Sequence, residues 1–141
     1  MPDRLQDALS WACAVLLAIL AAIALQALVN RGTTNQQRQL AAALILSGGD
    51  PERGRSVIAA TGCGACHTIP GVPGARGRVA SSLVGLATRN LVGGVVPNTP
   101  ENLTRWIEDP RALNPATAMP KLGLSPQQAA DVASYLYVAG Q

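Results

Sequence analysis

The 141-residue sequence is short of the side chains on which most chemistry depends. It has one histidine, three cysteines, two methionines and no phenylalanine, and charged residues make up only 13%. One histidine without a second pair of cysteines cannot build a dinuclear copper site. No nucleophile–base pair and no phosphate-binding loop is visible, which argues against independent enzymatic chemistry. The low charge density argues against nucleic-acid binding, although the net charge is +3.

What the sequence does contain is one motif, Cys63-Gly64-Ala65-Cys66-His67. C-x-x-C-H is the attachment site of a c-type haem, in which two thiols bind the vinyl groups and the adjacent imidazole binds the iron. A thioredoxin-type redox pair would need a βαβ context, and a zinc site would need a second pair of ligands. A disulfide is the plain structural alternative. The motif predicts one covalently bound haem c, with His67 as its proximal ligand.

Once one histidine binds haem iron, the sixth position is left to a methionine or to no side chain at all. Met1 begins the segment before a long apolar run, so Met119 is the candidate thioether. It lies in residues 115–120, where two prolines prevent regular helix and predict an irregular loop. The alternative is a methionine that merely packs in the core. Thioether ligation would raise the potential and close the iron to oxygen, which favours electron transfer over catalysis.

Residues 8–29 form a run of 22 residues without a formal charge. As a helix the run would be roughly 33 Å long, enough to cross a hydrocarbon core of about 30 Å. A cleaved signal peptide is the main alternative, but its apolar core is normally only about 7–15 residues long. Cys13 lies inside the run rather than after it, which argues against a lipoprotein anchor. The length predicts an uncleaved transmembrane signal anchor.

Two opposing indications bear on the orientation of this anchor. The basic residues that follow the run, Arg31 and Arg38, weakly favour a cytoplasmic domain by the positive-inside rule. A c-type haem, however, is attached outside the cytoplasmic membrane in bacteria. We therefore predict a single-pass protein of the bacterial inner membrane, with residues 31–141 in the periplasm.

The chain is expected to divide into three parts. Residues 1–30 contain the anchor, residues 31–49 form a linker or helical stalk, and residues 50–141 form a small all-α domain that holds one haem. Within that domain residues 69–96 have many glycines and prolines and no sustained apolar period. So long a loop in a small domain needs a function, and wrapping the edge of a haem would supply one.

Three helices are expected in the domain, each opened by an N-cap residue and a proline. They begin at Asp50, Thr99 and Ser125, and the first two end near Thr61 and Glu108. Ser125 and the glutamine three residues later have the register of a capping box. The third helix carries apolar side chains at the spacing of one buried face, namely Ala129, Val132, Ala133, Leu136 and Tyr137.

With these stretches in view, the chain resembles class I cytochromes c over residues 50–139. The supporting segments are residues 62–71 (GCGACHTIPG), 98–110 (NTPENLTRWIEDP) and 118–125 (AMPKLGLS). They are most similar to the cytochrome c domain fused to subunit II of caa-type haem–copper oxidases and to membrane-anchored relatives. The resemblance implies a fold of three or four helices in which the first and last cross, with Gly54 near Tyr135.

The resemblance also implies roles for individual residues. It implies axial ligation by His67 and Met119, an arginine near a haem propionate at Arg89, and an aromatic ring beside the haem at Trp106. Leu83 and Ile69 would pack on the faces of the haem. One position departs from the family pattern: Ser81 stands where a proline usually offers its carbonyl to the proximal imidazole. We expect the imidazole of His67 to be held less rigidly as a result, because the residues around a metal ligand fix its orientation.

These features predict a membrane-anchored carrier of single electrons in a respiratory chain, to or within a terminal oxidase. Its partners would be redox proteins, namely the oxidase, a quinol-oxidising complex or a soluble cytochrome, with no small-molecule substrate and no nucleic acid. Two alternatives stay open: the electron-accepting subunit of a membrane dehydrogenase, and a haem-based gas sensor. Four arginines are candidates for a basic docking face at the haem edge: Arg53, Arg55, Arg76 and Arg78.

Overall fold

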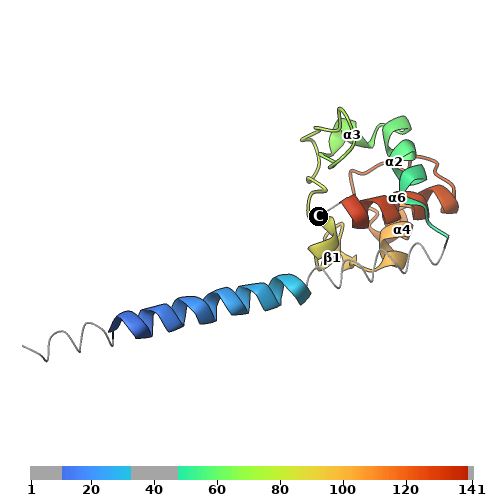
Figure 1. The fold of residues 1–141 in the computed structure, drawn as a ribbon. Helices are drawn as coiled ribbons and strands as arrows, with labels where there is room; N and C mark the ends of the chain where they lie inside the picture. The colour runs from blue at the N-terminus through green and yellow to red at the C-terminus, as the bar shows by residue number, and fades with distance from the viewer. Residues whose placement is uncertain (1–10, 33–47, 140–141) are drawn as a thin grey trace, which may run out of the picture. The chain divides into compact units, whose positions relative to one another are not determined.

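A computed structural model of the chain describes residues 11–32 and 48–139. Most of the expected linker over residues 31–49 lies outside the described residues, and so does Met1. The N-terminal helix and the C-terminal domain form separate compact units. In the C-terminal unit the chain forms helices around a central core, with long loops on one side (Figure 1).

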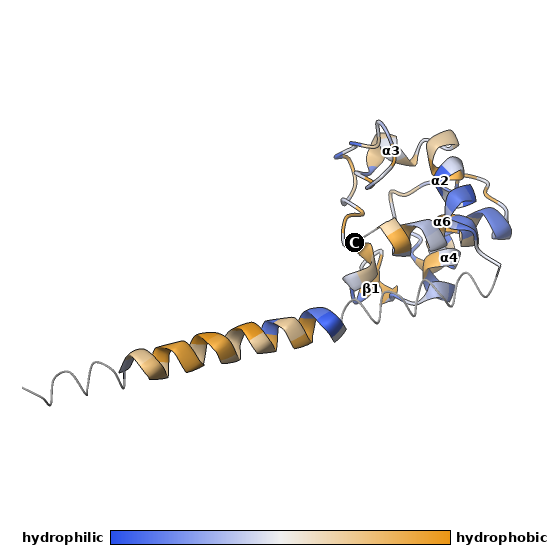
Figure 2. Cartoon of the chain, in the orientation of Figure 1, coloured by the Kyte–Doolittle hydropathy of each residue, from blue (hydrophilic) through white to orange (hydrophobic). Residues whose placement is uncertain are grey.

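The N-terminal helix runs over Trp11–Gly32. None of its side chains is buried, and it is coloured hydrophobic over most of its length in Figure 2. Among the described residues it is the one helix whose length and composition suit a membrane span, although a signal sequence shares these properties. The predicted apolar helix is therefore present, and it supports attachment to a membrane.

Helix α2 (Pro51–Ala60) begins where the sequence predicts. The Asp50 carboxylate accepts hydrogen bonds from the amides of Glu52 and Arg53, which have no partner inside the helix. The helix ends at Thr61, and Gly62 takes a left-handed conformation that turns the chain into the next segment. Both boundaries of this helix are thus set by local sequence.

Helix α4 (Pro100–Glu108) is capped by Thr99, whose hydroxyl accepts from the Asn102 amide. It was expected to stop at Asp109, but a further turn, α5 (Pro110–Leu113), follows at once. Asp109 ends α4 and also caps α5, since its carboxylate accepts from the Ala112 amide. The Asp-Pro pair therefore redirects the helical chain instead of ending it.

Helix α6 (Pro126–Ala139) opens with the predicted capping box. The Ser125 amide donates to the Gln128 side chain, and the Gln128 amide donates to the Ser125 hydroxyl. The five side chains predicted to form one apolar face are all buried. The pattern of the sequence thus correctly identified the face of α6 that packs in the core.

Helices α2 and α6 pack closely against each other. A Cβ atom on Gly54 would collide with the backbone carbonyl of Asp131 in α6, so only glycine permits this approach. The predicted crossing is therefore present, but the contact of Gly54 is with Asp131 and Val132. Tyr135, which the resemblance had placed there, lies one turn further on and donates its hydroxyl hydrogen to the Pro70 carbonyl.

The side chain of Asp131 joins the start of α2 to α6. It is only 2% exposed and accepts four hydrogen bonds, two from the Arg53 guanidinium and one each from the Asp50 amide and the Gln127 side chain. Burial by itself would raise the pKa of Asp131, but these donors together hold that pKa below its ordinary value. Sequence analysis had left this residue without a role.

The segment expected to be one long loop contains more structure than the sequence indicated. It holds a 3-10 turn, η1 (Leu86–Thr88), and an antiparallel hairpin of strands β1 (Leu91–Val92) and β2 (Val96–Pro97). The strands are too short for alternation to reveal them. Two glycines with positive φ, Gly93 and Gly94, make the turn between them.

Asn98 ties this segment to α6. Its side-chain amide donates to the carbonyl oxygens of Leu86 and Arg89, and its side-chain oxygen accepts from the Tyr137 hydroxyl at 2.7 Å. Burial raises the pKa of Tyr137, which keeps the hydroxyl protonated as a donor. One asparagine therefore fixes η1, the backbone of Arg89 and the end of α6 relative to one another.

Candidate functional site

The helices and loops of the domain enclose a cavity of about 400 Å³. Its walls come from α2, α4, α6 and the short helix α3 (Cys63–Cys66), and from the loop after α3, the hairpin and the loop before α6. A volume of this size is within the usual range for cofactor and ligand sites. All eight residues that the sequence or the resemblance singled out line it: Cys63, Cys66, His67, Ile69, Leu83, Arg89, Trp106 and Met119.

The two cysteines lie on a single helical turn, α3 (Cys63–Cys66). A spacing of three residues places side chains on the same face of a helix, and both thiols line the cavity. Both are free thiols, so the structure contradicts the disulfide alternative. The turn can exist because Gly62 precedes it in a left-handed conformation. The local backbone therefore presents two thiols to one cavity.

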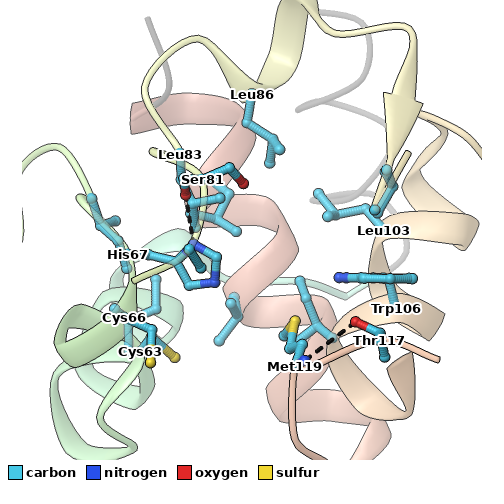
Figure 3. A pocket seen from close by; sticks show the side chains of 18 of the residues that line it. Cys63, Cys66, His67, Ser81, Leu83, Leu86, Leu103, Trp106, Thr117 and Met119 are labelled. Atoms are coloured by element: carbon cyan, nitrogen blue, oxygen red, sulfur yellow. Dashed lines mark hydrogen bonds between the residues drawn. The ribbon is translucent and has the colours of Figure 1, made fainter. Parts of the chain in front are cut away.

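His67 ends this turn and leaves it in an extended conformation. Its Nδ1 atom lies 2.7 Å from the Ser81 carbonyl oxygen, and because a carbonyl can only accept, Nδ1 carries the proton. This bond leaves the lone pair of Nε2 available on a side chain that lines the cavity (Figure 3). The serine that replaces the usual proline thus still supplies the carbonyl acceptor.

Met119 lies on the wall opposite His67 (Figure 3). Its loop is held by short-range hydrogen bonds: the Met119 amide donates to the Thr117 hydroxyl, and the Thr117 amide donates to the Asn114 carbonyl. The segment is irregular, as its prolines predicted. Histidine and methionine side chains therefore face the same cavity from two separate parts of the chain.

Trp106 and Arg89 complete the side walls. The Trp106 ring is 9% exposed and packs on Gly93, where a Cβ atom would collide with it. Its indole nitrogen lies at the end of the ring nearest the cavity in Figure 3. The Arg89 guanidinium donates to the carbonyl oxygens of Ser82 and Val84. Both residues line the cavity, and their roles beside a haem stay predictions.

Apolar side chains that the sequence had not assigned to the site form most of its interior. The face of α6 supplies two of them, and the spacing i, i+3, i+4 along α4 groups two others with Trp106, so periodicity was the available signal. The remaining ones come from segments that meet only in the folded chain. The principal members are Ile58, Leu86, Leu103, Ile107, Val132 and Leu136.

The charge distribution differs from the one expected. Arg89 is the only residue with a permanent charge among those that line the cavity, and none of the four arginines proposed for the haem edge is among them. Arg53 pairs instead with Asp131 and Asp50, and Arg55 donates to the Gly71 carbonyl. Arg53 and Arg55 are therefore bound within the chain, and a basic docking face at the haem edge stays a prediction.

These residues fit a haem group by their chemistry. Two thiols on one turn, an imidazole with a free Nε2 atom and a thioether on the facing wall are the donors that c-type haem uses. The interior is apolar, as a porphyrin requires. The part of the chain that the structure describes holds no group of three His, Cys, Asp or Glu side chains that could bind a metal ion on its own.

The cavity and its fold define a haem-binding electron-transfer domain, and sequence comparison agrees with this. The Cytochrome c family profile matches residues 51–138. The chain therefore belongs to the cytochrome c family, whose members bind haem iron and transport electrons.

One relative extends the comparison beyond the family. Over 68 residues the chain is 32% identical to cytochrome c oxidase subunit 2 of Alkalihalophilus pseudofirmus. The matched segment covers 48% of this chain and 19% of that protein. The chain thus corresponds to only about a fifth of this relative. No solved structure matches the chain significantly.

Proposed function

We propose that this protein is a membrane-tethered monohaem cytochrome that passes single electrons to or within a terminal oxidase. The observation that carries the proposal is the convergence of four side chains on one apolar cavity: Cys63, Cys66, His67 and Met119. In this proposal the two thiols would hold one haem covalently, and the imidazole and the thioether would hold its iron. When bound, the haem supplies reversible one-electron chemistry at iron.

The surrounding residues orient these ligands and exclude water. The Ser81 carbonyl accepts from Nδ1 of His67 and so fixes both the tautomer and the plane of the ring. Leu83 and Ile69 would pack on the haem, with Trp106 beside it on the methionine side. Arg89 would lie near a propionate. If the imidazole and the thioether both hold the iron, the proposal includes no site for substrate or gas there.

The oxidase as partner is supported by the likeness to cytochrome c oxidase subunit 2 and by the N-terminal helix. Tethering raises the effective concentration of the domain near other membrane proteins. The proposed location is the bacterial inner membrane with the haem domain in the periplasm, since a c-type haem is attached on that side. The dehydrogenase subunit is the alternative that would use the same haem.

The test is purification of the complex that contains the chain. A C-terminal tag, mild detergent and a reduced-minus-oxidised spectrum would show which haems accompany it. Additional a-, b- or o-type bands together with cyanide-sensitive oxygen uptake would support the oxidase. Co-purification with a flavin- or quinone-containing dehydrogenase and no oxygen uptake would contradict it. Carbon monoxide binding by the reduced native protein would contradict ligation by Met119.

A further inference from the structure

The carbonyl that orients His67 belongs to a residue whose own backbone is not locked. Nδ1 of His67 donates to the Ser81 carbonyl at 2.7 Å, and Ser81 is exposed. A serine leaves φ free, and the direction of its carbonyl depends on the dihedral angles around it. Within the described residues neither the amide nor the hydroxyl of Ser81 bonds to another group of the protein. The direction of this carbonyl must therefore be fixed by neighbouring residues.

Two backbone hydrogen bonds hold the segment around Ser81 at its ends. The Ala80 amide donates to the Cys66 carbonyl at 3.0 Å. The Leu83 amide donates to the Thr68 carbonyl at 2.8 Å. Fixing these two ends does not fix the peptide groups between them, since each residue keeps two soft dihedral angles that can change in opposite senses.

Among the described residues, Arg89 is the side chain other than His67 that binds the backbone between these ends. Its guanidinium donates to the carbonyl oxygens of Ser82 and Val84. The Ser82 carbonyl is one peptide group beyond the Ser81 carbonyl, so holding the first limits how the second can turn. The planar guanidinium holds both of its acceptors in one geometry, which the point charge of an ammonium group does less rigidly.

Arg89 is held in turn by α6. The Asn98 side-chain amide donates to the Arg89 carbonyl at 2.9 Å and to the Leu86 carbonyl at 2.8 Å. The Tyr137 hydroxyl donates to the Asn98 side-chain oxygen at 2.7 Å, and Tyr137 is fully buried. Both ends of the Asn98 amide are therefore bound. A continuous series of hydrogen bonds leads from the interior of α6 to the backbone of Arg89.

We propose that Arg89, Asn98 and Tyr137 are positioning residues that orient the Ser81 carbonyl toward His67. This inference deepens the proposed function and rests on it, since the orientation of His67 matters in this way only if it holds haem iron. A well-oriented acceptor at Nδ1 makes an imidazole a more basic ligand, and a more basic ligand favours the more highly charged iron. Loosening the carbonyl should therefore raise the midpoint potential.

The experiment asks whether these side chains act through the Ser81 carbonyl. Tyr137→Phe removes only a hydroxyl, and Arg89→Lys keeps the positive charge but loses the planar contact with two carbonyls. Each would be made alone and together with Ser81→Pro, whose ring fixes φ of that residue. The proline removes no hydrogen bond within the described residues, because the Ser81 amide donates none. Tyr135→Phe is the matched control, since it removes a hydroxyl of the same helix that donates to the Pro70 carbonyl instead.

Two properties of the purified, full-length, haem-loaded protein would be measured. They are the midpoint potential, by optical redox titration, and the exchange of the Nδ1 proton of His67 with water, by NMR. In Tyr137→Phe and in Arg89→Lys we expect a higher potential and about threefold faster exchange, since part of the net contribution of one hydrogen bond is lost.

The second background tests the route of these effects. With Ser81→Pro both effects should shrink by about half or more, because the ring then fixes the carbonyl that the side chains otherwise orient. Tyr135→Phe should match its parent in both backgrounds. An unchanged haem absorption spectrum in every variant separates a loosened carbonyl from loss of fold, and either variant alone decides the test if the other fails to load haem.

Three results would overturn the inference. Equal shifts with and without Ser81→Pro would show that the side chains act by charge or by general loosening, not through this carbonyl. No shift in either single variant would show that the carbonyl is oriented without them. A shift in Tyr135→Phe as large as that in Tyr137→Phe would show that any hydroxyl lost from α6 has this effect. The measurements need no redox partner, so a search that finds no oxidase would refute the proposed function and leave these results unaffected.

Discussion

The two facing walls of the cavity are built in different ways. The histidine wall, residues 63–83, is held by backbone hydrogen bonds such as Gly77 N–H to the Gly64 carbonyl, and by close backbone packing. The methionine wall, residues 117–122, is held by short-range turns and by one exposed ion pair. The difference leads us to expect that substitutions in the methionine wall disturb the fold less than substitutions in the histidine wall.

The largest effect is expected at the covalent attachment itself. Replacing both Cys63 and Cys66 by serine should abolish haem that stays with the polypeptide after denaturation, because thioether bonds need both sulfurs. Haem staining of a denaturing gel measures this directly. Cys13→Ser is the matched control and should stain as the native chain does. Loss of staining in the control would mean that Cys13 takes part in haem attachment.

On the methionine wall, Met119→Ala should open the sixth position while the domain stays folded. The reduced variant should then bind carbon monoxide stoichiometrically, and its midpoint potential should fall, because a thioether stabilises the ferrous iron. Optical titration with carbon monoxide measures the first effect. Met119→Leu keeps nearly the same volume and should behave alike. A variant that still does not bind carbon monoxide would show that another side chain occupies the sixth position of the iron.

The close packing of the histidine wall can be broken with a single methyl group. A Cβ atom at Gly77 would collide with the backbone carbonyl of Ala65, so Gly77→Ala should lower the free energy of unfolding by about 3 kcal/mol. Gly74→Ala is the matched control: its φ is positive, but the Cβ would have open space, and a cost of about 1 kcal/mol is expected. Urea unfolding of the haem-loaded protein measures both, and equal losses would contradict the close approach.

Asp131 joins α2 to α6, and its contribution to the free energy of unfolding should depend on pH. Asp131→Asn should cost about 2 kcal/mol near neutral pH, because the amide cannot accept all four hydrogen bonds. The pKa of Asp131 is lowered by folding, so its contribution is present above the ordinary pKa of about 4 and is lost as the pH falls below it. The difference between native and variant should therefore shrink in acid.

Chemical denaturation at neutral pH and below pH 4 measures this difference. Glu52→Gln, which changes an exposed carboxylate at the same end of α2, serves as the control and should show no comparable change. A difference between native and Asp131→Asn that stays constant with pH would mean that the ionised carboxylate is not what joins the two helices.

The smallest effect is expected at the ion pair of the methionine wall. Both side chains are substantially exposed, so Lys121→Met should leave the melting temperature unchanged within error. Arg111→Met is the matched control on a neighbouring exposed cation. Melting curves at low and high salt measure both variants. A marked destabilisation confined to Lys121→Met would show that the methionine wall is held as firmly as the other wall.

Much of the fold was predictable because it rests on local rules. The starts of α2, α4 and α6 follow from Asp50, Thr99 and Ser125, and the buried face of α6 follows from its spacing. The hairpin and α5 were missed, because two-residue strands have no period and because Asp109 both ends one helix and opens another. A close approach of the two helices at Gly54 could be expected, but its contact with Asp131 could not be identified from the sequence.

The consequence of the missing proline remains a prediction. The Ser81 carbonyl accepts from His67 at 2.7 Å, so the hydrogen bond does not need the proline ring. Serine constrains its backbone less than proline does, and we still expect a softer orientation of the imidazole. Ser81→Pro should then shift the midpoint potential, and a potential equal to that of the native protein would remove this expectation.

The candidate ligands can be read from the sequence alone, because a C-x-x-C-H motif, one histidine and one downstream methionine permit very few ligand sets. The starts of α2, α4 and α6 also follow from the sequence, since caps and prolines act within a few residues. The partners of the charged side chains and the set of segments that line the cavity follow only from the folded chain. Arg53 is bound by a carboxylate 78 positions away, and side chains from distant segments line one cavity. Such pairings depend on contacts between remote segments, which no local pattern encodes.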